Sequence, residues 1–174
     1  MLEGLIRDVQ TDDAEELCGI YNHYVLNTII TFEEEPVSVD AMLVRIAEIT
    51  QTYPWIVDVA DGKLTGYAYA YPWKSRSAYR RTVESGIYLH PGFMGRGIGT
   101  RLYGVLLRLL KEQGIHAVIG GIALPNPASI ALHEKLGFKP IGHFKEVGFK
   151  FGQWIDVGYW ELVFGVAQPP PAVS

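Results

Sequence analysis

The segment from His90 to Leu110, HPGFMGRGIGTRLYGVLLRLL, concentrates glycine at the start of a predicted helix. The glycines concerned are Gly92, Gly95, Gly97, Gly99 and Gly104. A glycine inside a helix costs about 1 kcal/mol relative to alanine, so bare backbone is predicted to be needed here. A strand, a glycine-rich turn and a helix N-terminus together form an anion site, because free N–H groups and the helix dipole converge there. We expect a phosphate or pyrophosphate ligand; a flexible surface turn is the alternative.

Two familiar nucleotide-binding patterns do not fit this segment. A P-loop ends in Gly-Lys-Ser/Thr, whereas residues 97–100 read GIGT. The dinucleotide fingerprint Gly-x-Gly-x-x-Gly follows the first strand of a parallel unit. Here the glycines follow the predicted strand over 82–90, which is the fourth strand of the chain, and Gly99 is not followed by the required third glycine.

Length and composition restrict the class of protein. The chain has 174 residues, 48% of them hydrophobic and 20% charged, which is typical of one globular domain, expected over residues 1–165. A net charge of −4 argues against a broad nucleic-acid surface. No signal-peptide core and no apolar run of about 20 residues is found, so we expect a cytoplasmic protein without a membrane segment. The Pro-rich end, 166–174, is expected to be disordered.

Cysteine and histidine add little chemistry. Cys18 is the only cysteine, which excludes an internal disulfide and fits a reducing compartment. It is interpreted as a small buried hydrophobe rather than a reactive thiol. The histidines show no metal-ligand spacing, so no metal is predicted.

Periodicity and turn residues predict a mixed sheet with helices on its faces. Asp12 and Glu15 suggest a capping box, Ser38 and Asn126 are candidate helix N-caps, and Gly137 is a candidate helix stop. Asp61-Gly62 predicts a hairpin turn. The predicted elements, in order, are a strand 4–9, helices 13–27 and 38–53, strands 55–60, 63–73 and 82–90, a helix 98–113, a strand 116–124, a helix 126–136 and two strands within 138–164. This order of strands and helices indicates the mixed α/β class.

Two motifs resemble the GNAT superfamily of N-acetyltransferases: MGRGIG at 94–99 and NPASIALHEKLGF at 126–138. Longer blocks resemble its phosphinothricin and methionine sulfoximine acetyltransferase branch, over about 6–164. These blocks are TFEEEP, YPWIV, YPWKSRSAYRRTVESGIYLHP and GFKFGQWIDVGYW. The resemblance implies the acyl-CoA N-acyltransferase fold: a central, mostly antiparallel sheet that splays after its fourth strand, with helices on both faces.

The resemblance also implies acetyl-CoA as co-substrate. Its pantetheine would pair with the strand backbone at Ile87, Tyr88 and Leu89. Asn126 and Ser129 would contact the pantetheine arm, although Asn126 is also a plain helix cap. The pyrophosphate would lie on the backbone of Gly95, Arg96, Gly97, Ile98, Gly99 and Thr100.

Acetyl transfer to an amine needs a neutral nucleophile, a stabilised oxyanion and a protonated leaving thiolate. An amine of pKa about 10.4 is neutral in roughly one molecule per thousand at pH 7, so a general base has a role. Glu84 lies mid-strand, and the resemblance assigns it that role; an ion pair with Arg76, Arg80 or Arg81 is the alternative. His133 and Tyr103 are candidate proton donors, with a structural histidine and a core aromatic as the competing interpretations.

The substrate side is read from a cationic loop and from the same resemblance. Lys74, Arg76 and Tyr79 precede Glu84 and suit an amine that also carries negative charge, while Arg80 and Arg81 read as solvated charges. The full set of predicted substrate contacts is Phe32, Lys74, Arg76, Tyr79, Glu84, Ser85 and Val157. Trp154 and Trp160 are predicted to be packing residues.

The expected substrate is a small amino-acid-like compound such as L-phosphinothricin, L-methionine sulfoximine or methionine sulfone. The branch implies a homodimer formed through the C-terminal strands, with Val157 reaching the partner's pocket. Acetylation of another amine or of a protein N-terminus, and a non-catalytic acyl-CoA sensor, are the alternatives.

Overall fold

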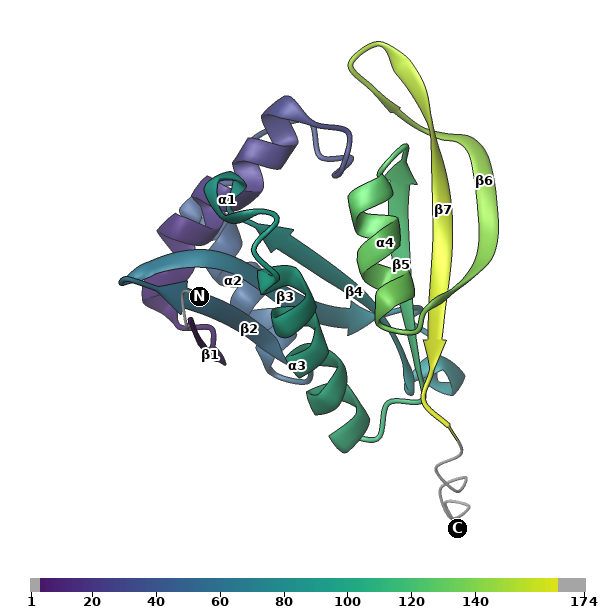
Figure 1. The fold of residues 1–174 in the computed structure, drawn as a ribbon, viewed down its shortest axis with the longest axis horizontal. Coiled ribbons are helices and arrows are strands. Elements are labelled where there is room, and N and C mark those ends of the chain that lie inside the picture. Colours follow the sequence, from purple (N-terminus) through teal and green to yellow (C-terminus); the bar gives the residue numbers. More distant parts are fainter. Residues whose placement is uncertain (1–3, 166–174) are drawn as a thin grey trace.

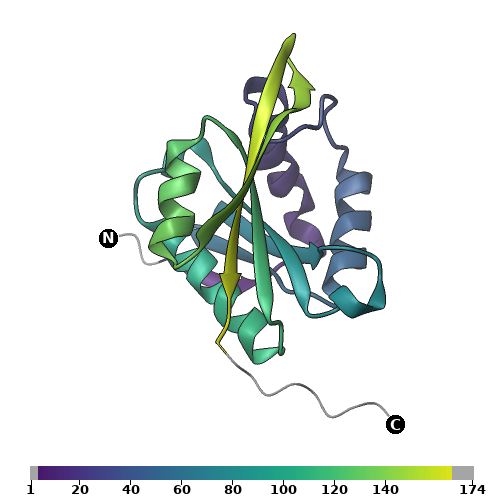
Figure 2. The same ribbon diagram turned by 90° about the vertical axis from the view of Figure 1, so that its right-hand side faces the viewer.

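The computed structural model describes residues 4–165, which form one seven-stranded sheet with four α-helices packed against it (Figures 1 and 2). Its elements are β1 (Leu5–Asp8), α1 (Ala14–Asn27), α2 (Val39–Thr50), β2 (Trp55–Ala60), β3 (Lys63–Pro72), β4 (Thr82–Leu89), α3 (Ile98–Glu112), β5 (Ala117–Leu124), α4 (Pro127–Lys135), β6 (Lys139–Lys150) and β7 (Gln153–Val163). The order of elements is the predicted one. The Pro-rich end, 166–174, and residues 1–3 lie outside the described residues.

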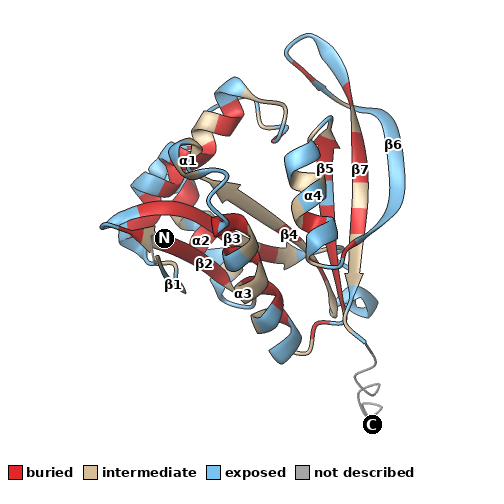
Figure 3. Ribbon diagram, viewed as in Figure 1, coloured by how far each residue is buried: buried red, intermediate tan, exposed pale blue. Residues whose placement is uncertain are grey.

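The sheet has the strand order β1-β2-β3-β4-β5-β7-β6. Every neighbouring pair is antiparallel except β4 and β5, which are parallel. This mostly antiparallel mixed sheet confirms the predicted fold class. The last strand inserts between β5 and β6, so β6 forms the exposed edge (Figure 3).

The sheet splays at its centre. β4 pairs with β3 along Val83–Leu89, but it pairs with β5 only over Thr82–Glu84. Beyond Glu84 the two strands diverge, as Figure 1 shows. The predicted opening after the fourth strand is therefore present, and the side of β4 that faces β5 lacks a strand partner from Ser85 onward.

Helices cover both faces, each over its own apolar core (Figure 2). On one face α1 and α2 pack on Trp55, Val57 and Tyr67. On the other face α3 buries Leu102, Leu106 and Leu110 against the central strands. Those leucines recur at helical spacing, so the sequence pattern of α3 matches the face that it buries.

Most of the local signals act as predicted. Asp61 and Gly62 have φ of 51° and 72°, the left-handed pair of a type I′ turn between β2 and β3. The Ser38 hydroxyl accepts the Ala41 N–H at 3.2 Å, which caps α2. Gly137 follows α4 with φ of 95°.

The capping box predicted from Asp12 and Glu15 is wrong. Asp12 lies within a short 3-10 turn, and α1 begins only at Ala14. Asp13 is the residue used instead: its carboxylate accepts the Gln10 N–H at 2.7 Å and pairs with both terminal nitrogens of Arg7. A partner on the preceding strand decided which of the two adjacent aspartates turns inward.

The β6–β7 hairpin projects beyond the rest of the sheet (Figures 1 and 2). Its exposed large apolar side chains are Ile141, Phe144, Val147, Phe149, Phe151, Trp154 and Val163. Trp154, predicted to be a packing residue, is 63% exposed, while Trp160 is buried as predicted. None of the described helices is both long and apolar enough to cross a lipid bilayer.

Candidate active site

The glycine-rich turn presents free backbone donors at the start of α3. Gly95 and Gly97 have φ of 74° and 79°, a left-handed conformation that favours glycine. Gly97 is the N-cap residue, so the first N–H groups of α3 have no partner within the helix. Residues 94–97 are exposed. The turn can therefore receive an anion, as the sequence predicts.

The unpaired side of β4 provides a second binding edge. Ile87, Tyr88 and Leu89 lie beyond the last β4–β5 pair. The Leu89 carbonyl already accepts the Tyr24 hydroxyl at 2.6 Å, so it is less available than its neighbours. An extended ligand can add to this edge as a further strand would. These residues fit the pantetheine arm of acetyl-CoA.

A narrow cleft of about 100 Å³ lies where β4 and β5 separate. Glu84, Ser85, Asn126, Ser129 and His133, all predicted site residues, line it. Asn126 uses its side-chain oxygen to cap α4, accepting the Ser129 N–H at 3.1 Å, which leaves its NH₂ group for a ligand. The two roles considered for Asn126 are thus compatible.

Glu84 is half-buried in this cleft. Burial raises the pKa of its carboxyl, while the Tyr71 hydroxyl and the charge of Lys74 act in the opposite direction. Tyr71 is its cross-strand partner on β3. None of the ion pairs among residues 4–165 involves Glu84, so the alternative of a pair with Arg76, Arg80 or Arg81 is not realised. A carboxylate with a raised pKa and no cation partner is suited to accept a proton.

Tyr103 and His133 lie on the opposite face of β4 from Glu84. The Ser85 and Tyr103 hydroxyls are 2.7 Å apart, and the Tyr103 oxygen is 3.1 Å from His133 Nε2. His133 Nδ1 lies 2.8 Å from the Ser129 carbonyl oxygen, which can only accept, so Nδ1 carries the proton. Burial lowers the pKa of His133, which favours the neutral ring, and in that form Nε2 accepts from the Tyr103 hydroxyl.

The two candidate proton donors, His133 and Tyr103, differ in their access to the cleft. His133 reaches the cleft, whereas Tyr103 is fully buried and lines neither the cleft nor the adjoining pocket. Burial also raises the pKa of the Tyr103 hydroxyl, with the Ser85 hydrogen bond opposing. Tyr103 therefore touches the site only through Ser85 and His133. This position favours the interpretation as a core aromatic over that as a proton donor.

Two consecutive glycines on β5 make room for both sides of the site. A Cβ at Gly120 would lie 2.5 Å from His133 Nε2, and one at Gly121 would lie 3.2 Å from Glu84 Oε1. Successive residues of a strand point to opposite faces, so each glycine serves one of them. Sequence reasoning did not use this pair, although GG in a predicted strand was visible.

A larger pocket of about 870 Å³ opens on the α1 and α2 side of the sheet. Glu84 lines it together with the predicted Phe32 and Val157. Its walls also include residues that sequence reasoning missed: Tyr21, Glu33, Arg45, Tyr69, Tyr71, Phe149 and Tyr159. The alternation YAYAY at 67–71, which puts tyrosines on one strand face, was the available signal.

The cationic loop contributes less to this pocket than predicted. Lys74, Arg76 and Tyr79 line a separate cleft of about 290 Å³. Lys74 is close enough for its charge to affect Glu84, and its Nζ lies 4.5 Å from the Trp73 ring centre. The cation in the wall of the larger pocket is Arg45 of α2, which pairs with Glu33 at 2.7 Å.

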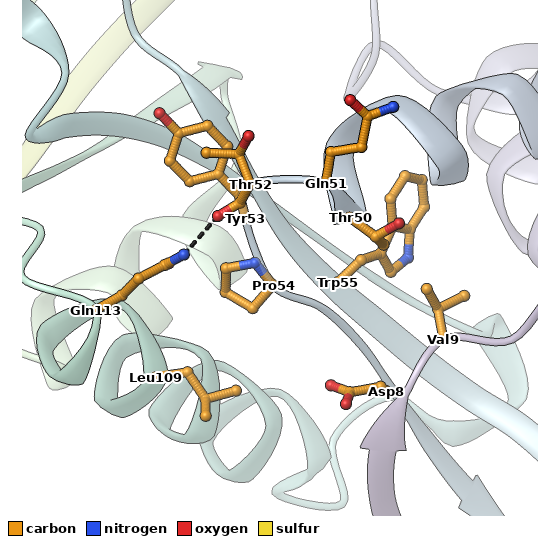
Figure 4. A pocket seen from close by; sticks show the side chains of 10 residues that line it. All are labelled: Asp8, Val9, Thr50, Gln51, Thr52, Tyr53, Pro54, Trp55, Leu109 and Gln113. Carbon is orange, nitrogen blue, oxygen red and sulfur yellow. Dashed lines mark hydrogen bonds between the residues drawn. The ribbon is translucent and has the colours of Figure 1, made fainter.

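Another cleft, of about 480 Å³, lies between the end of α2, the start of β2 and the end of α3 (Figure 4). It shares no lining residue with the larger pocket or with the narrow cleft between β4 and β5. No group of three or more His, Cys, Asp or Glu within residues 4–165 is arranged to hold a metal ion.

An opened sheet, a helix N-terminus that can bind a pyrophosphate and a carboxylate where the opening begins are the features of an acyl-CoA-dependent N-acyltransferase. Residues 6–158 match the family model described as an acetyltransferase (GNAT) domain. The chain belongs to this family.

Similar proteins place the chain in one branch. It is 38% identical to the phosphinothricin N-acetyltransferase of Streptomyces viridochromogenes, covering 97% of this chain and 92% of that one. It is 35% identical to the L-methionine sulfoximine/L-methionine sulfone acetyltransferase of Salmonella typhimurium, covering 96% and 98%. The crystal structure of a Sinorhizobium meliloti phosphinothricin acetyltransferase in complex with acetyl-CoA superimposes with a TM-score of 0.94 at 36% identity, covering 99% and 96%. The protein is an acetyl-CoA-dependent N-acetyltransferase of this branch.

Proposed function

We propose that this enzyme acetylates the α-amine of a small amino-acid-like substrate, with L-phosphinothricin, L-methionine sulfoximine and methionine sulfone as the first candidates. The observation that carries the proposal is the position of Glu84, whose carboxylate lines both the narrow cleft and the larger aromatic pocket. A substrate amine in the pocket and a thioester in the cleft would meet at this residue. The similarity to enzymes named for these substrates supports the choice of compounds.

The reaction is direct attack in a ternary complex. The Glu84 carboxylate removes a proton from the substrate ammonium, and the neutral nitrogen adds to the thioester carbonyl carbon. The C–S bond then breaks, the nitrogen of the adduct loses its second proton as the amide forms, and the thiolate takes up one proton, so that one proton in total remains with the Glu84 carboxylate and passes to solvent. His133 and Ser129 are among the polar side chains that line the cleft. Because His133 Nδ1 already donates to the Ser129 carbonyl, it would have to exchange that bond to serve the thiolate.

We also propose a cytoplasmic homodimer. The exposed apolar side chains of the β6–β7 hairpin are the surface that a second copy would cover. Val157, expected to reach the partner's pocket, lies 8% exposed in the pocket of its own chain. A partner contribution to the site would therefore come from other residues of the hairpin.

Thiol release from acetyl-CoA tests the proposed function. Purified protein is assayed with phosphinothricin, methionine sulfoximine, methionine sulfone, free glutamate and a peptide with a free N-terminus. Fast release with one of the first three compounds, and none with the peptide, is expected. Release only with the peptide would favour N-terminal acetylation, and acetyl-CoA binding without release from any amine would contradict the proposal.

A further inference from the structure

Lys150 is a buried cation that the proposed reaction does not use. It is the last residue of β6 and is 1% exposed. None of the ion pairs found among residues 4–165 includes it. Burial lowers the pKa of its ammonium group, while the charges of Glu34 and Glu33 oppose that shift. A lysine buried without a paired carboxylate is costly, so its position calls for a specific role.

The ammonium group holds a segment that is far away in the sequence. Lys150 Nζ donates to the Thr31 carbonyl oxygen at 2.8 Å, across 119 positions of the chain. The Thr31 hydroxyl is in turn 2.7 Å from the Tyr21 hydroxyl of α1. Thr31 is thus bound from two sides, by the β6–β7 hairpin and by α1, and is 7% exposed.

The residue after Thr31 forms a wall of the larger pocket. Phe32 is 40% exposed, so its ring is only partly covered by its neighbours. The ring rests on the bare backbone of β6: a Cβ at Gly148 would lie 2.0 Å from it. On its other side Glu33 pairs with Arg45 of α2 at 2.7 Å. The place of Phe32 over the pocket therefore depends on its contact with Gly148 and on the attachments of its two neighbours.

We propose that Lys150 is a positioning residue that holds the Thr31–Phe32 segment across the substrate pocket and thereby sets which amino-acid side chains the enzyme accepts. The Thr31 carbonyl oxygen accepts a hydrogen bond from the ammonium group of Lys150, which the long lysine side chain carries to it. The proposal rests on the proposed function, because it assigns Phe32 to the pocket that receives the amino acid.

The test compares Lys150→Met, Phe32→Ala and the double variant in the full-length protein. Lys150→Met is expected to raise KM for the preferred amino acid about tenfold and to leave KM for acetyl-CoA within about twofold. In the Phe32→Ala background, Lys150→Met should add little, because it acts through the same side chain. Lys150→Arg, which keeps a donor, should recover most of the lost affinity. Lys139→Met, an exposed lysine of the same strand, is the matched control.

Amide hydrogen exchange of residues 28–36 in the ligand-free protein is the second measurement. Faster exchange there in Lys150→Met, with α3 unchanged, is expected. Unchanged exchange, an equal rise of both KM values, or a full additional effect in the Phe32→Ala background would overturn the proposal. If the wild-type enzyme acetylates none of the amino acids, the proposed function fails, and exchange alone decides whether Lys150 holds the segment.

Discussion

At the scale of single residues, the site depends on two titratable groups on opposite sides of β4, the carboxyl of Glu84 and the ring of His133. Glu84 faces the pocket without a cation partner, and burial raises the pKa of its carboxyl. His133, on the other side of β4, is held neutral with its proton on Nδ1. Both ring nitrogens of His133 take part in hydrogen bonds, whereas Glu84 lines the pocket. Glu84 is therefore better placed to accept a proton from a substrate.

Replacing Glu84 by Gln should lower kcat by about 10²- to 10⁴-fold at neutral pH, the usual range for a general base. Acetyl-CoA affinity should change little, because the carboxylate is not part of the α3 turn. In the wild type, activity should fall as the pH drops through the raised pKa of Glu84, since only the ionised form accepts the proton. Steady-state kinetics and acetyl-CoA titrations check both points. Full activity of Glu84→Gln across pH 6–9 would remove Glu84 from this role.

At the scale of elements, β5 illustrates how a strand can be built around side chains that belong to its neighbours. Val118 and Ile119 pack into the core, whereas Gly120 and Gly121 leave space on opposite faces. Glycine inside a strand weakens it, so the pair lowers the stability of β5 in exchange for room at the site. His133 cannot move away easily, because its ring also packs at 5.1 Å from Tyr103 and 5.0 Å from Phe138, measured between ring centres.

Gly120→Ala should therefore lower the free energy of unfolding by about 1–3 kcal/mol, as overpacking does. The added methyl group displaces His133 from Tyr103 and lowers turnover as well. Gly121→Ala meets softer neighbours, with Glu84 Oε1 at 3.2 Å and Tyr159 at 3.4 Å, so it should change kcat more than stability. Urea unfolding and initial rates separate the two variants. Equal stability of Gly120→Ala and the wild type would contradict this account.

At the scale of the whole molecule, the β6–β7 hairpin is the part of the described chain that leaves several large apolar side chains exposed. Its end reaches beyond the sheet (Figure 1), and Ile141 and Phe144 on its edge strand β6 are 53% and 55% exposed. The same hairpin carries Gly148 and Lys150, which contact the Phe32 segment. Assembly through this hairpin and the shape of the substrate pocket are therefore expected to be linked.

Ile141→Lys combined with Phe144→Lys should weaken the proposed dimer by about 30-fold or more, the effect of losing roughly 2 kcal/mol at an interface. Light scattering across a dilution series measures the change in the dimer dissociation constant. The far-ultraviolet spectrum should stay the same, because both side chains are exposed. A wild-type protein that is monomeric at all concentrations would rule out this interface.

Local sequence determined much of this protein, because caps and turns need only a few adjacent residues. Ser38, Asn126, Asp61-Gly62 and Gly137 act where their chemistry predicts, and the period of the α3 leucines identifies the buried face. The motifs around 94–99 and 126–138 likewise indicated the anion turn and the family. Which of Asp12 and Asp13 turns inward was not determined locally, since Arg7 on β1 decided it.

Only the tertiary structure decided what surrounds Glu84. The pocket wall joins Phe32, Arg45, Tyr71 and Tyr159, which come from a loop, a helix and two strands, and no local pattern encodes their meeting. The placing of Tyr103 behind Ser85, and of Lys150 beneath Thr31, depends on strand order and on which face each side chain takes. Local signals arise from backbone geometry within a few residues. A site arises from the register of strands and the packing of helices, which depend on the whole chain at once.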